Sequence, residues 1–346
     1  MRILVTGSNG LIGGEAVAYF GAQGHTIVGA DNNMRRDFFG ESGDTLWNLK
    51  RLRLMKMDYI PTFTDIRKLT DVRALFRGYG PFDAIIHCAA QPSHDKAREI
   101  PIIDFEVNAV GTLNLLEQTR LTCPEAVFIF MSTNKVYGTA PNELDLVKLP
   151  TRFDYAHARD HHGISESMRI DQSTHSIFGV SKVAADLMVQ EYAKSFAMRT
   201  AVLRGGCLTG PHHSGVELHG FLSYLVKTAM HGGHYKIYGY QGKQVRDNIH
   251  SIDVVKAMEQ IILDPLAGEV YNIGGGRENS VSIIEAIQKV EDLTGPLDWE
   301  YVPIPRIGDH ICYISDLRKF KDHYPAWSIT KSVDDIIHEL VKEEER

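Results

Sequence analysis

The sequence predicts an α/β fold with a doubly wound parallel sheet and a smaller C-terminal α/β lobe. Short apolar segments alternate with helical ones along the first part of the chain, as in parallel sheets whose strands are joined by helices. A glycine-rich turn separates the first apolar segment from the first helix. The length of 346 residues suits one large domain and a smaller lobe. We expect a first domain at 1–205 and a second lobe at 206–346, from which 245–273 returns to the first.

Composition excludes several functional classes. The net charge is −7 and the isoelectric point about 6.1, which argues against a nucleic-acid or membrane-surface binder. The chain enters a strand directly, and no apolar run approaches the ~20 residues that a membrane helix needs. We therefore expect a cytoplasmic protein. The cysteines are widely spaced, which predicts reduced thiols at Cys88, Cys123, Cys207 and Cys312.

The first strand, residues 2–7, leads into a helical segment at 8–25 through three evenly spaced glycines. Gly7, Gly10 and Gly13 permit a tight turn and a close backbone approach to a pyrophosphate. The free N–H groups at the helix N-terminus would then point at that anion. This segment predicts a dinucleotide site.

The second strand, residues 26–31, indicates which dinucleotide is bound. It ends in Asp31, 18 residues after Gly13. An acidic residue there accepts hydrogen bonds from the adenosine ribose and repels a 2′-phosphate, which favours NAD over NADP. Arg35 and Arg36 follow, but an arginine pair in a loop is more often solvated than bound to phosphate.

The alternation of strands and helices continues through the first domain. The expected elements are a helix at 67–77, a strand at 83–90, a helix at 103–120, a strand at 126–133, a helix at 174–195 and a strand at 200–206. Ligands of such sheets bind at the carboxyl ends of the strands. Polar or small residues at these ends, or on the facing helix, are Asp65, Ala89, Ala90, Asn108 and Ser132.

Several motifs together resemble the extended short-chain dehydrogenase/reductases that act on nucleotide sugars, which have a Rossmann fold. These motifs are TGSNGLIGG (6–14), HCAAQPS (87–93), NAVGT (108–112), MSTNKVYG (131–138), VRDNIHSIDVVKA (245–257) and YNIGGG (271–276). The resemblance implies cofactor contacts at Gly7, Asn9, Gly10, Leu11, Ile12, Gly13, Asp31, Asn32, Asp65, Ile66, Ala89, Ala90, Gln91, Asn108, Lys182 and Arg204. It implies substrate contacts at Gln91, Ser93, Thr133, Asn134, His219, Lys243, Arg246, Arg306 and Asp309. The planar forks of Arg246 and Arg306 suit diphosphate oxygens.

The residues after Ser132 indicate the reaction. In the 4,6-dehydratases that the chain resembles, the sequence at this place is Thr-Asp-Glu. This chain instead has Thr133, Asn134 and Lys135. Without the two carboxylates, water elimination lacks its acid and base. Epimerisation through transient oxidation needs no such pair, so the motif favours an epimerase.

Longer stretches resemble the CDP-tyvelose 2-epimerases, also described as CDP-paratose 2-epimerases. They lie at 168–193, 203–226 and 239–251. The resemblance implies NAD-dependent epimerisation of a CDP-3,6-dideoxyhexose at C2, from CDP-paratose to CDP-tyvelose, through a transient 2-keto sugar. The alternatives are another nucleotide-sugar epimerase, such as one acting at C4, or a catalytically silent relative.

Phe178 is the main departure from the family. It stands four residues before Lys182, where the family has the tyrosine of a Tyr-x-x-x-Lys pair. A phenyl ring has no ionisable oxygen and transfers no proton. Three explanations fit: the chain is a tyrosine-to-phenylalanine variant, the protein binds without catalysis, or another group acts. Candidates for that group are Thr133, Ser132, His175 and Lys182.

The segment at 139–173 is polar, rich in His and Asp, and weakly periodic. Long irregular segments of compact domains are usually lids or binding loops, so we expect a lid-like insertion at the substrate mouth. Its histidines lack the spacing of a metal site, so we expect no metal at His157, His161 or His162.

The resemblance also implies a homodimer or homotetramer. In this superfamily the helices expected at 103–120 and 174–195 commonly pair across a two-fold axis. A monomer core would explain their apolar positions nearly as well. These positions include Leu113, Leu116, Val180, Val183 and Leu187.

Overall fold

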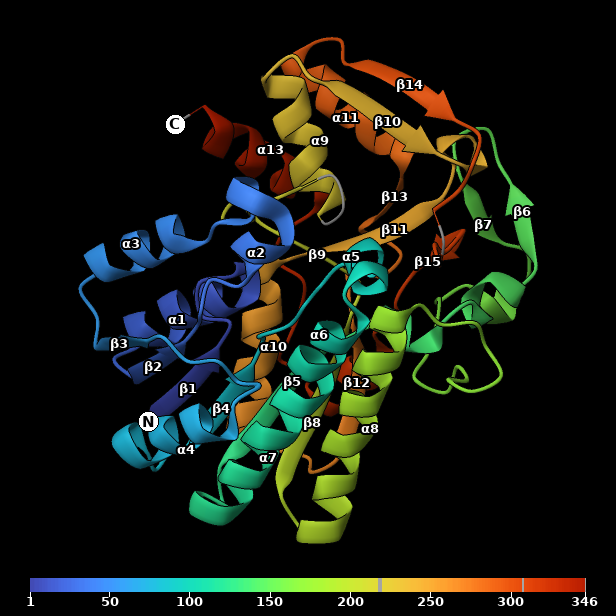
Figure 1. Ribbon diagram of the computed structural model, residues 1–346. Coiled ribbons are helices and arrows are strands. Elements are labelled where there is room, and N and C mark those ends of the chain that lie inside the picture. Colours follow the sequence, from blue (N-terminus) through green and yellow to red (C-terminus); the bar gives the residue numbers. More distant parts are fainter. Residues whose placement is uncertain (217–219, 307, 346) are drawn as a thin grey trace.

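A seven-stranded parallel sheet forms the centre of the molecule in the computed structural model, which describes residues 1–216, 220–306 and 308–345 (Figure 1). The strand order is β12-β8-β5-β4-β1-β2-β3. The strands are β1 (Arg2–Thr6), β2 (Thr26–Ala30), β3 (Tyr59–Thr62), β4 (Ala84–His87), β5 (Val127–Thr133), β8 (Arg199–Gly205) and β12 (Glu269–Ile273). The order reverses between β1 and β4, where a crevice for ligands is expected. The prediction of a doubly wound parallel sheet is confirmed.

Helices cover both faces of this sheet. One face packs against α1 (Leu11–Ala22), α3 (Leu46–Leu54), α10 (Ser251–Leu263) and α12 (Arg318–His323) through a buried cluster that includes Phe20 and Met258. The other face packs against α4 (Leu69–Tyr79), α7 (Gly111–Thr122) and α8 (Ile177–Phe196) through a cluster that includes Leu115 and Val189. Buried apolar residues on both faces explain why the strands read as continuous apolar runs.

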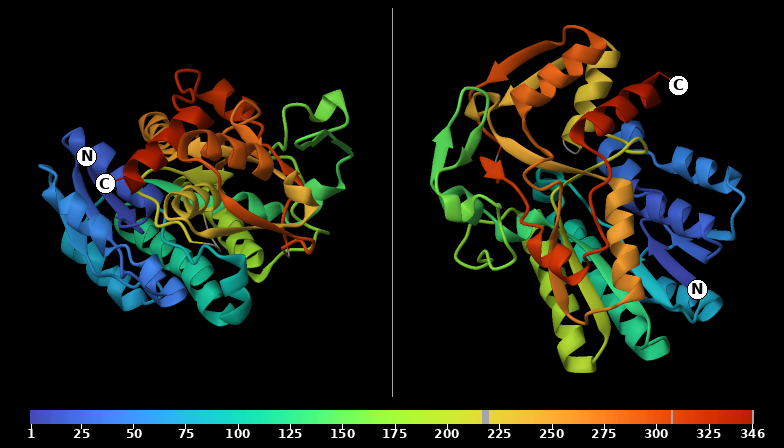
Figure 2. Two further views of the ribbon diagram at one scale, coloured as in Figure 1. Left: turned by 90° about the horizontal axis from the view of Figure 1, so that it is seen from above. Right: turned by 180° about the vertical axis from the view of Figure 1, so that it is seen from behind.

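The second lobe lies over the carboxyl ends of the strands, as the additional views in Figure 2 also show. Its helices share an apolar cluster that includes Leu225, Ile287 and Ile336. The helices are α9 (Phe221–Met230), α11 (Ile283–Thr294) and α13 (Val333–Glu344). Its strands are β9 (Cys207–Thr209), β10 (His234–Tyr238), β11 (Val245–His250), β13 (Ser280–Ser282), β14 (Asp298–Val302) and β15 (Cys312–Tyr313).

The segment at 245–273 is divided between the two parts of the molecule. Strand β11 belongs to the four-stranded sheet of the second lobe, next to β9, β13 and β15. Helix α10 packs against α1, and β12 completes the edge of the seven-stranded sheet beside β8. Thus only the part from Ser251 onward returns to the first domain.

The segment at 139–173 forms an irregular arm on the outside of the second lobe. It contains the short hairpin of β6 (Leu146–Lys148) and β7 (Phe153–Tyr155), with 3₁₀ turns at Ala140–Glu143 and Ala158–Asp160. The amide of Phe153 donates to the carbonyl oxygen of Lys243 at 2.9 Å. Asp154 pairs with Arg277 at 2.9 Å. These partly buried contacts hold the arm against the second lobe.

Several elements differ from their predicted bounds. The helix expected at 103–120 consists of α6 (Pro101–Phe105), a π-helical turn at Glu106–Val110, and α7. The helix expected at 174–195 begins at Ile177 because the Ser176 side chain caps its N-terminus, accepting from the amide of Gly179 at 3.0 Å. The remaining first-domain helices are α2 (Arg35–Phe39) and α5 (His94–Glu99). The edge strand β3 was not predicted, since Pro61 interrupts its pattern.

Among the described residues, no helix is both long and apolar enough to cross a membrane. The four cysteines are all free thiols, as predicted.

Candidate active site

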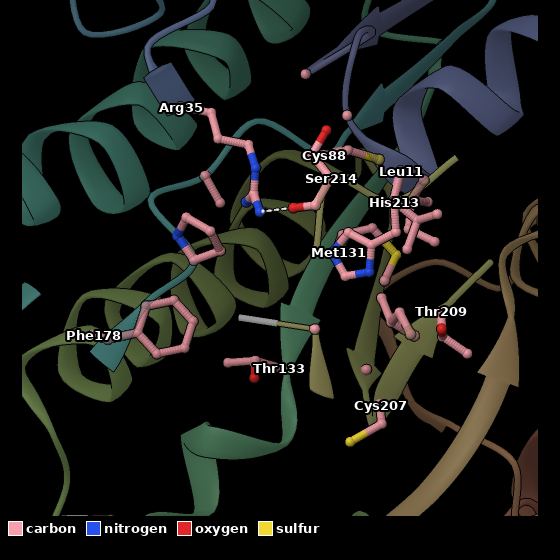
Figure 3. A pocket seen from close by; sticks show the side chains of 18 of the residues that line it. Leu11, Arg35, Cys88, Met131, Thr133, Phe178, Cys207, Thr209, His213 and Ser214 are labelled. Atoms are coloured by element: carbon pink, nitrogen blue, oxygen red, sulfur yellow. Dashed lines mark hydrogen bonds between the residues drawn. The ribbon is translucent and has the colours of Figure 1, made fainter. Parts of the chain in front are cut away.

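A cavity of about 470 Å³ lies between the carboxyl ends of the strands and the second lobe. Its walls come from both parts of the chain: the turn after β1, the ends of β2, β4 and β5, the first turns of α8, and the second lobe. Figure 3 shows Phe178 and Thr133 on one side of this space, with Leu11 and Met131 across from them. The cavity therefore adjoins the predicted glycine turn and the Phe178 site.

The glycine turn has the close backbone packing that a dinucleotide site requires. Gly7 has a φ of +65°, and a Cβ added to it would lie 2.8 Å from the amide nitrogen of Ala89. A Cβ added to Gly13 would lie 2.1 Å from the carbonyl oxygen of Gly7. The side-chain oxygen Oδ1 of Asn9 is buried there without a hydrogen-bond partner among the described residues. This cradle, with an unused buried acceptor, fits a nicotinamide dinucleotide.

Asp31 lines the cavity at the end of β2. Its carboxylate accepts hydrogen bonds from the amides of Asn9 at 3.0 Å and Asn33 at 2.7 Å. Burial raises the pKa of Asp31, and the two amides oppose that shift. The carboxylate is thus held facing the glycine turn by backbone donors.

The expectation that the arginine pair is solvated is wrong for Arg35, which contacts other parts of the protein. Its guanidinium donates to the carbonyl oxygen of Ser214 at 2.7 Å (Figure 3). The same guanidinium lies 4.8 Å over the ring of Phe39. Burial lowers the pKa of Arg35 to about 10. Arg36 remains half exposed and pairs with Glu41. Arg35 therefore links the first domain to the second lobe, a contact between distant segments that the sequence does not reveal.

Thr133, Phe178 and Lys182 all line the cavity. The Nζ of Lys182 donates to the carbonyl oxygen of Met131 at 2.7 Å and lies 4.1 Å over the Phe130 ring. Burial lowers the pKa of Lys182 to about 8.

Ser132 and His175 are committed to other contacts. The Ser132 hydroxyl donates to Asp186 at 2.6 Å. The two ring nitrogens of His175 lie 2.9 Å and 2.7 Å from the backbone carbonyl oxygens of Ser173 and Val136. Ser132 still lines the cavity, whereas His175 does not. The Ser132 hydroxyl proton is thus directed at Asp186, and both ring nitrogens of His175 face backbone carbonyl oxygens.

The second lobe adds Arg246, Arg306 and Asp309 to the lining of the cavity, which also includes Asn134. The guanidinium of Arg246 donates to the carboxylate of Asp309. Burial would lower the pKa of Arg246, but Asp309 raises it above its usual value. The guanidinium of Arg306 lies 4.9 Å over the Tyr238 ring. These two cations fit the diphosphate of a nucleotide ligand.

Five predicted residues do not line this cavity, because their side chains serve the fold. The Gln91 amide donates to Asp104 at 2.7 Å, and the Asn108 amide donates to the same carboxylate at 3.1 Å. The others are Ser93, which caps α5, Arg204, which pairs with Asp186, and Lys243, which donates to the carbonyl oxygen of Leu149. The other predicted contact residues among those described all line the cavity. His219 lies outside the described residues.

One further expectation receives a structural answer. No described residue of the segment at 139–173 lines the cavity, which disagrees with its predicted place at the substrate mouth. The described residues contain no group of three or more histidine, cysteine or acidic residues arranged to hold a metal. Sequence reasoning missed His94 and Cys207, which line the cavity without any motif that signals it.

Comparisons with known proteins agree with this geometry. The model of a family described as the NAD dependent epimerase/dehydratase family matches residues 3–274. A CDP-paratose 2-epimerase of Salmonella typhi is 30% identical over 98% of both chains. A dTDP-glucose 4,6-dehydratase of Salmonella typhimurium is 26% identical over 91% of this chain and 82% of its own. The solved structure of Thermus thermophilus UDP-glucose 4-epimerase in complex with NAD shares the fold, with a TM-score of 0.79, 24% identity and coverage of 100% and 99%.

Proposed function

This chain belongs to the NAD dependent epimerase/dehydratase family, and on that premise we propose that it epimerises a CDP-3,6-dideoxyhexose at C2, converting CDP-paratose into CDP-tyvelose. The observation that carries the proposal is the wall of the cavity after β5. There Asn134 and Lys135 replace the two carboxylates that water elimination requires. The relative named CDP-paratose 2-epimerase, which aligns over 98% of this chain, supports the choice of sugar and nucleotide.

The cofactor is NAD, in agreement with the family and with the prediction. When bound, NAD accepts a hydride from a sugar carbinol carbon and can return it. The glycine turn would hold the pyrophosphate, Asp31 the adenosine ribose, and Lys182 the nicotinamide ribose. Phe178 and Lys182 are both buried, which would limit the access of bulk water to the reacting sugar.

Arg246 and Arg306 would bind the diphosphate of the sugar nucleotide at the other end of the cavity. Asp309 forms an ion pair with Arg246. We expect diphosphate oxygens to share or replace this partner, so that Arg246 is never left as an uncompensated buried charge.

A panel of nucleotide sugars tests the proposal. The protein should convert CDP-paratose into CDP-tyvelose, followed by proton NMR of the sugar ring. UDP-glucose and dTDP-glucose, supplied at the same concentration, should remain unchanged. Turnover of UDP-glucose to UDP-galactose in place of the CDP-sugar would contradict C2 specificity and support a C4 epimerase.

The catalytically silent alternative is favoured by one observation, the phenylalanine at position 178. A silent relative would bind NAD and a CDP-sugar with both binding ends intact but form no product. Binding measured by calorimetry together with an unchanged NMR spectrum of every sugar in the panel would establish that alternative.

Cofactor selectivity depends on Asp31 in this account. Asp31→Ala is expected to weaken NAD binding by about tenfold, the equivalent of about 1.4 kcal/mol, and to reduce the discrimination against NADP. Asp37→Ala, an acidic residue on the same segment that does not line the cavity, is the control and should leave both affinities unchanged. Fluorescence titration with each dinucleotide measures the effect. Tighter binding of NADP than of NAD by the unaltered protein would contradict the role of Asp31.

A homodimer through α8 is our proposal for the assembly. Leu116 is buried in the core, and Leu113 and Val183 pack against core clusters, but Val180 and Leu187 are 50% and 49% exposed. An exposed apolar face on a helix of this length favours a partner surface. Leu187→Asp should lower the mass measured by light scattering to that of a monomer.

The control for this assembly test is Leu54→Asp, at an exposed apolar residue on α3. It should leave the mass of the unaltered protein unchanged. A monomeric mass for the unaltered protein at micromolar concentration would contradict the dimer.

A further inference from the structure

Lys135 lines the cavity beside Phe178 and has no assigned role in binding or proton transfer. It belongs to the 3₁₀ turn Asn134–Tyr137, directly after β5. A Cβ added to Gly179 would lie 3.0 Å from the carbonyl oxygen of Lys135, so this backbone touches the first turn of α8 next to Phe178. The Lys135 side chain is 14% exposed, and its Nζ donates to the carbonyl oxygen of Gly308 at 3.1 Å.

We propose that the amine of Lys135 accepts and returns the proton of the reacting sugar hydroxyl, in place of the oxygen that Phe178 lacks. The inference rests on the proposed function and adds a residue to it. As the carbinol C–O bond becomes a carbonyl, the O–H bond breaks and its proton passes to the neutral amine, which becomes an ammonium. The reverse transfer restores the hydroxyl. The hydrogen and electron pair of the C–H bond are those that the cofactor accepts and returns, as stated above.

The surroundings of Lys135 are compatible with this task. Burial lowers the pKa of Lys135 to about 8, Asp309 opposes the shift, and Arg246 adds to it. A base is most effective when its pKa lies near the working pH. The groups that interact with Lys135 come from both parts of the chain and are Asp309, Arg246, Cys207, His94 and His310.

His94 is a poorer candidate than Lys135, although its ring lies 5.3 Å from that of Phe178. Burial, with Lys135 nearby, lowers the pKa of His94 to about 3, so its imidazole is a weak base at neutral pH. The Nδ1 of His94 is also engaged with the hydroxyl of Ser176 at 3.2 Å. A proton taken from an alcohol would not stay on this ring.

Lys182 has a similarly lowered pKa but a different position. The Phe130 ring beneath its Nζ favours the charged ammonium. The groups whose charges act on it are Asp186, Cys88 and Asp104, all in the first domain. Lys135 instead lies 4.0 Å from Asp309, among the groups assigned to the substrate. Their positions therefore assign Lys182 to the cofactor and Lys135 to the sugar.

The test compares the unaltered chain with the single variant Phe178→Tyr and four further variants, using CDP-paratose and proton NMR. Lys135→Met should lower kcat by about 10²–10⁴-fold with NAD content unchanged. Lys135→Arg should be equally impaired, because a guanidinium keeps its proton. Lys148→Met, at an exposed lysine on β6, should be fully active. In the double variant Lys135→Met with Phe178→Tyr, the new hydroxyl should raise kcat at least tenfold above that of Lys135→Met. A variant that failed to fold could not recover activity in this way.

The pH profile adds a readout that a structural role would not move. For the unaltered chain, kcat should rise with pH through about 8, since the neutral amine is the base. That rise should be absent in Lys135→Met.

Each other outcome overturns a defined part of the account. An active chain whose kcat is unchanged by Lys135→Met contradicts the role of Lys135 alone. If the unaltered chain is inactive and Phe178→Tyr makes it active, the role of Lys135 is contradicted and the proposed function is retained. That result would indicate that the chain is a tyrosine-to-phenylalanine variant. If neither the unaltered chain nor Phe178→Tyr turns over CDP-paratose, the proposed function and the role of Lys135 are both contradicted.

Discussion

Asp186→Ala is expected to lower the free energy of unfolding by about 3–5 kcal/mol, the cost of leaving a buried charge without its partner. Asp186 is fully buried and Arg204 only 4% exposed. The guanidinium of Arg204 donates to both carboxylate oxygens of Asp186, at 3.0 Å and 2.9 Å. Burial would lower the pKa of Arg204, but the bonds with Asp186 raise it above its usual value. The guanidinium therefore keeps its charge, and removing Asp186 leaves it without a partner carboxylate in the core.

Two controls separate the buried pair from charge loss in general. Glu125→Ala removes the partner of Arg199 in an exposed ion pair and should cost about 0–1 kcal/mol. The double variant Asp186→Leu with Arg204→Met leaves no isolated charge and should recover most of the stability. Urea unfolding measures all three. A cost below about 1 kcal/mol for Asp186→Ala would contradict this account of the pair.

Gly13→Ala should destabilise the protein by about 1–3 kcal/mol and weaken NAD binding by roughly tenfold to a hundredfold. The added Cβ would lie 2.1 Å from the carbonyl oxygen of Gly7, which is backbone and cannot rotate away. The turn must therefore open, and the pyrophosphate cradle loses its shape. Thermal unfolding and a dinucleotide titration measure the two effects.

Gly78→Ala is the matched control, because it places the same methyl group in helix α4 with no atom within 4 Å. Alanine is the better helix former, so this variant should gain about 0.5–1 kcal/mol and bind NAD normally. Equal NAD affinity in Gly13→Ala and Gly78→Ala would contradict the role given to the glycine turn.

The cofactor half of the site was predictable because its signals are local. Gly7, Gly10, Gly13 and Asp31 follow one strand and end the next, and parallel strands bring such ends to one edge of a sheet. The same rule brought Thr133 toward Lys182, since both lie at a carboxyl end or on the helix that faces it. Short-range pattern and sheet topology are sufficient for this part.

The remaining site depended on contacts that no local pattern encodes. Arg204 was predicted to touch the cofactor, yet it pairs with Asp186 in the core. Lys243 turns toward the carbonyl oxygen of Leu149, which lies 94 positions earlier in the chain. The arm at 139–173 looked like a lid because it is polar, but its backbone bonds fasten it to the outside of the second lobe. In each case tertiary packing, which the local sequence does not encode, determines which group the side chain or segment contacts.

Turnover of CDP-paratose in heavy water tests the central claim most directly. In an epimerase that works by transient oxidation, the hydrogen removed from C2 returns to C2 without exchange with solvent. The account predicts CDP-tyvelose that carries protium at C2, with deuterium only on exchangeable hydroxyls, as read by proton NMR and mass spectrometry. CDP-tyvelose with deuterium at C2 would indicate deprotonation of that carbon instead and would contradict the account.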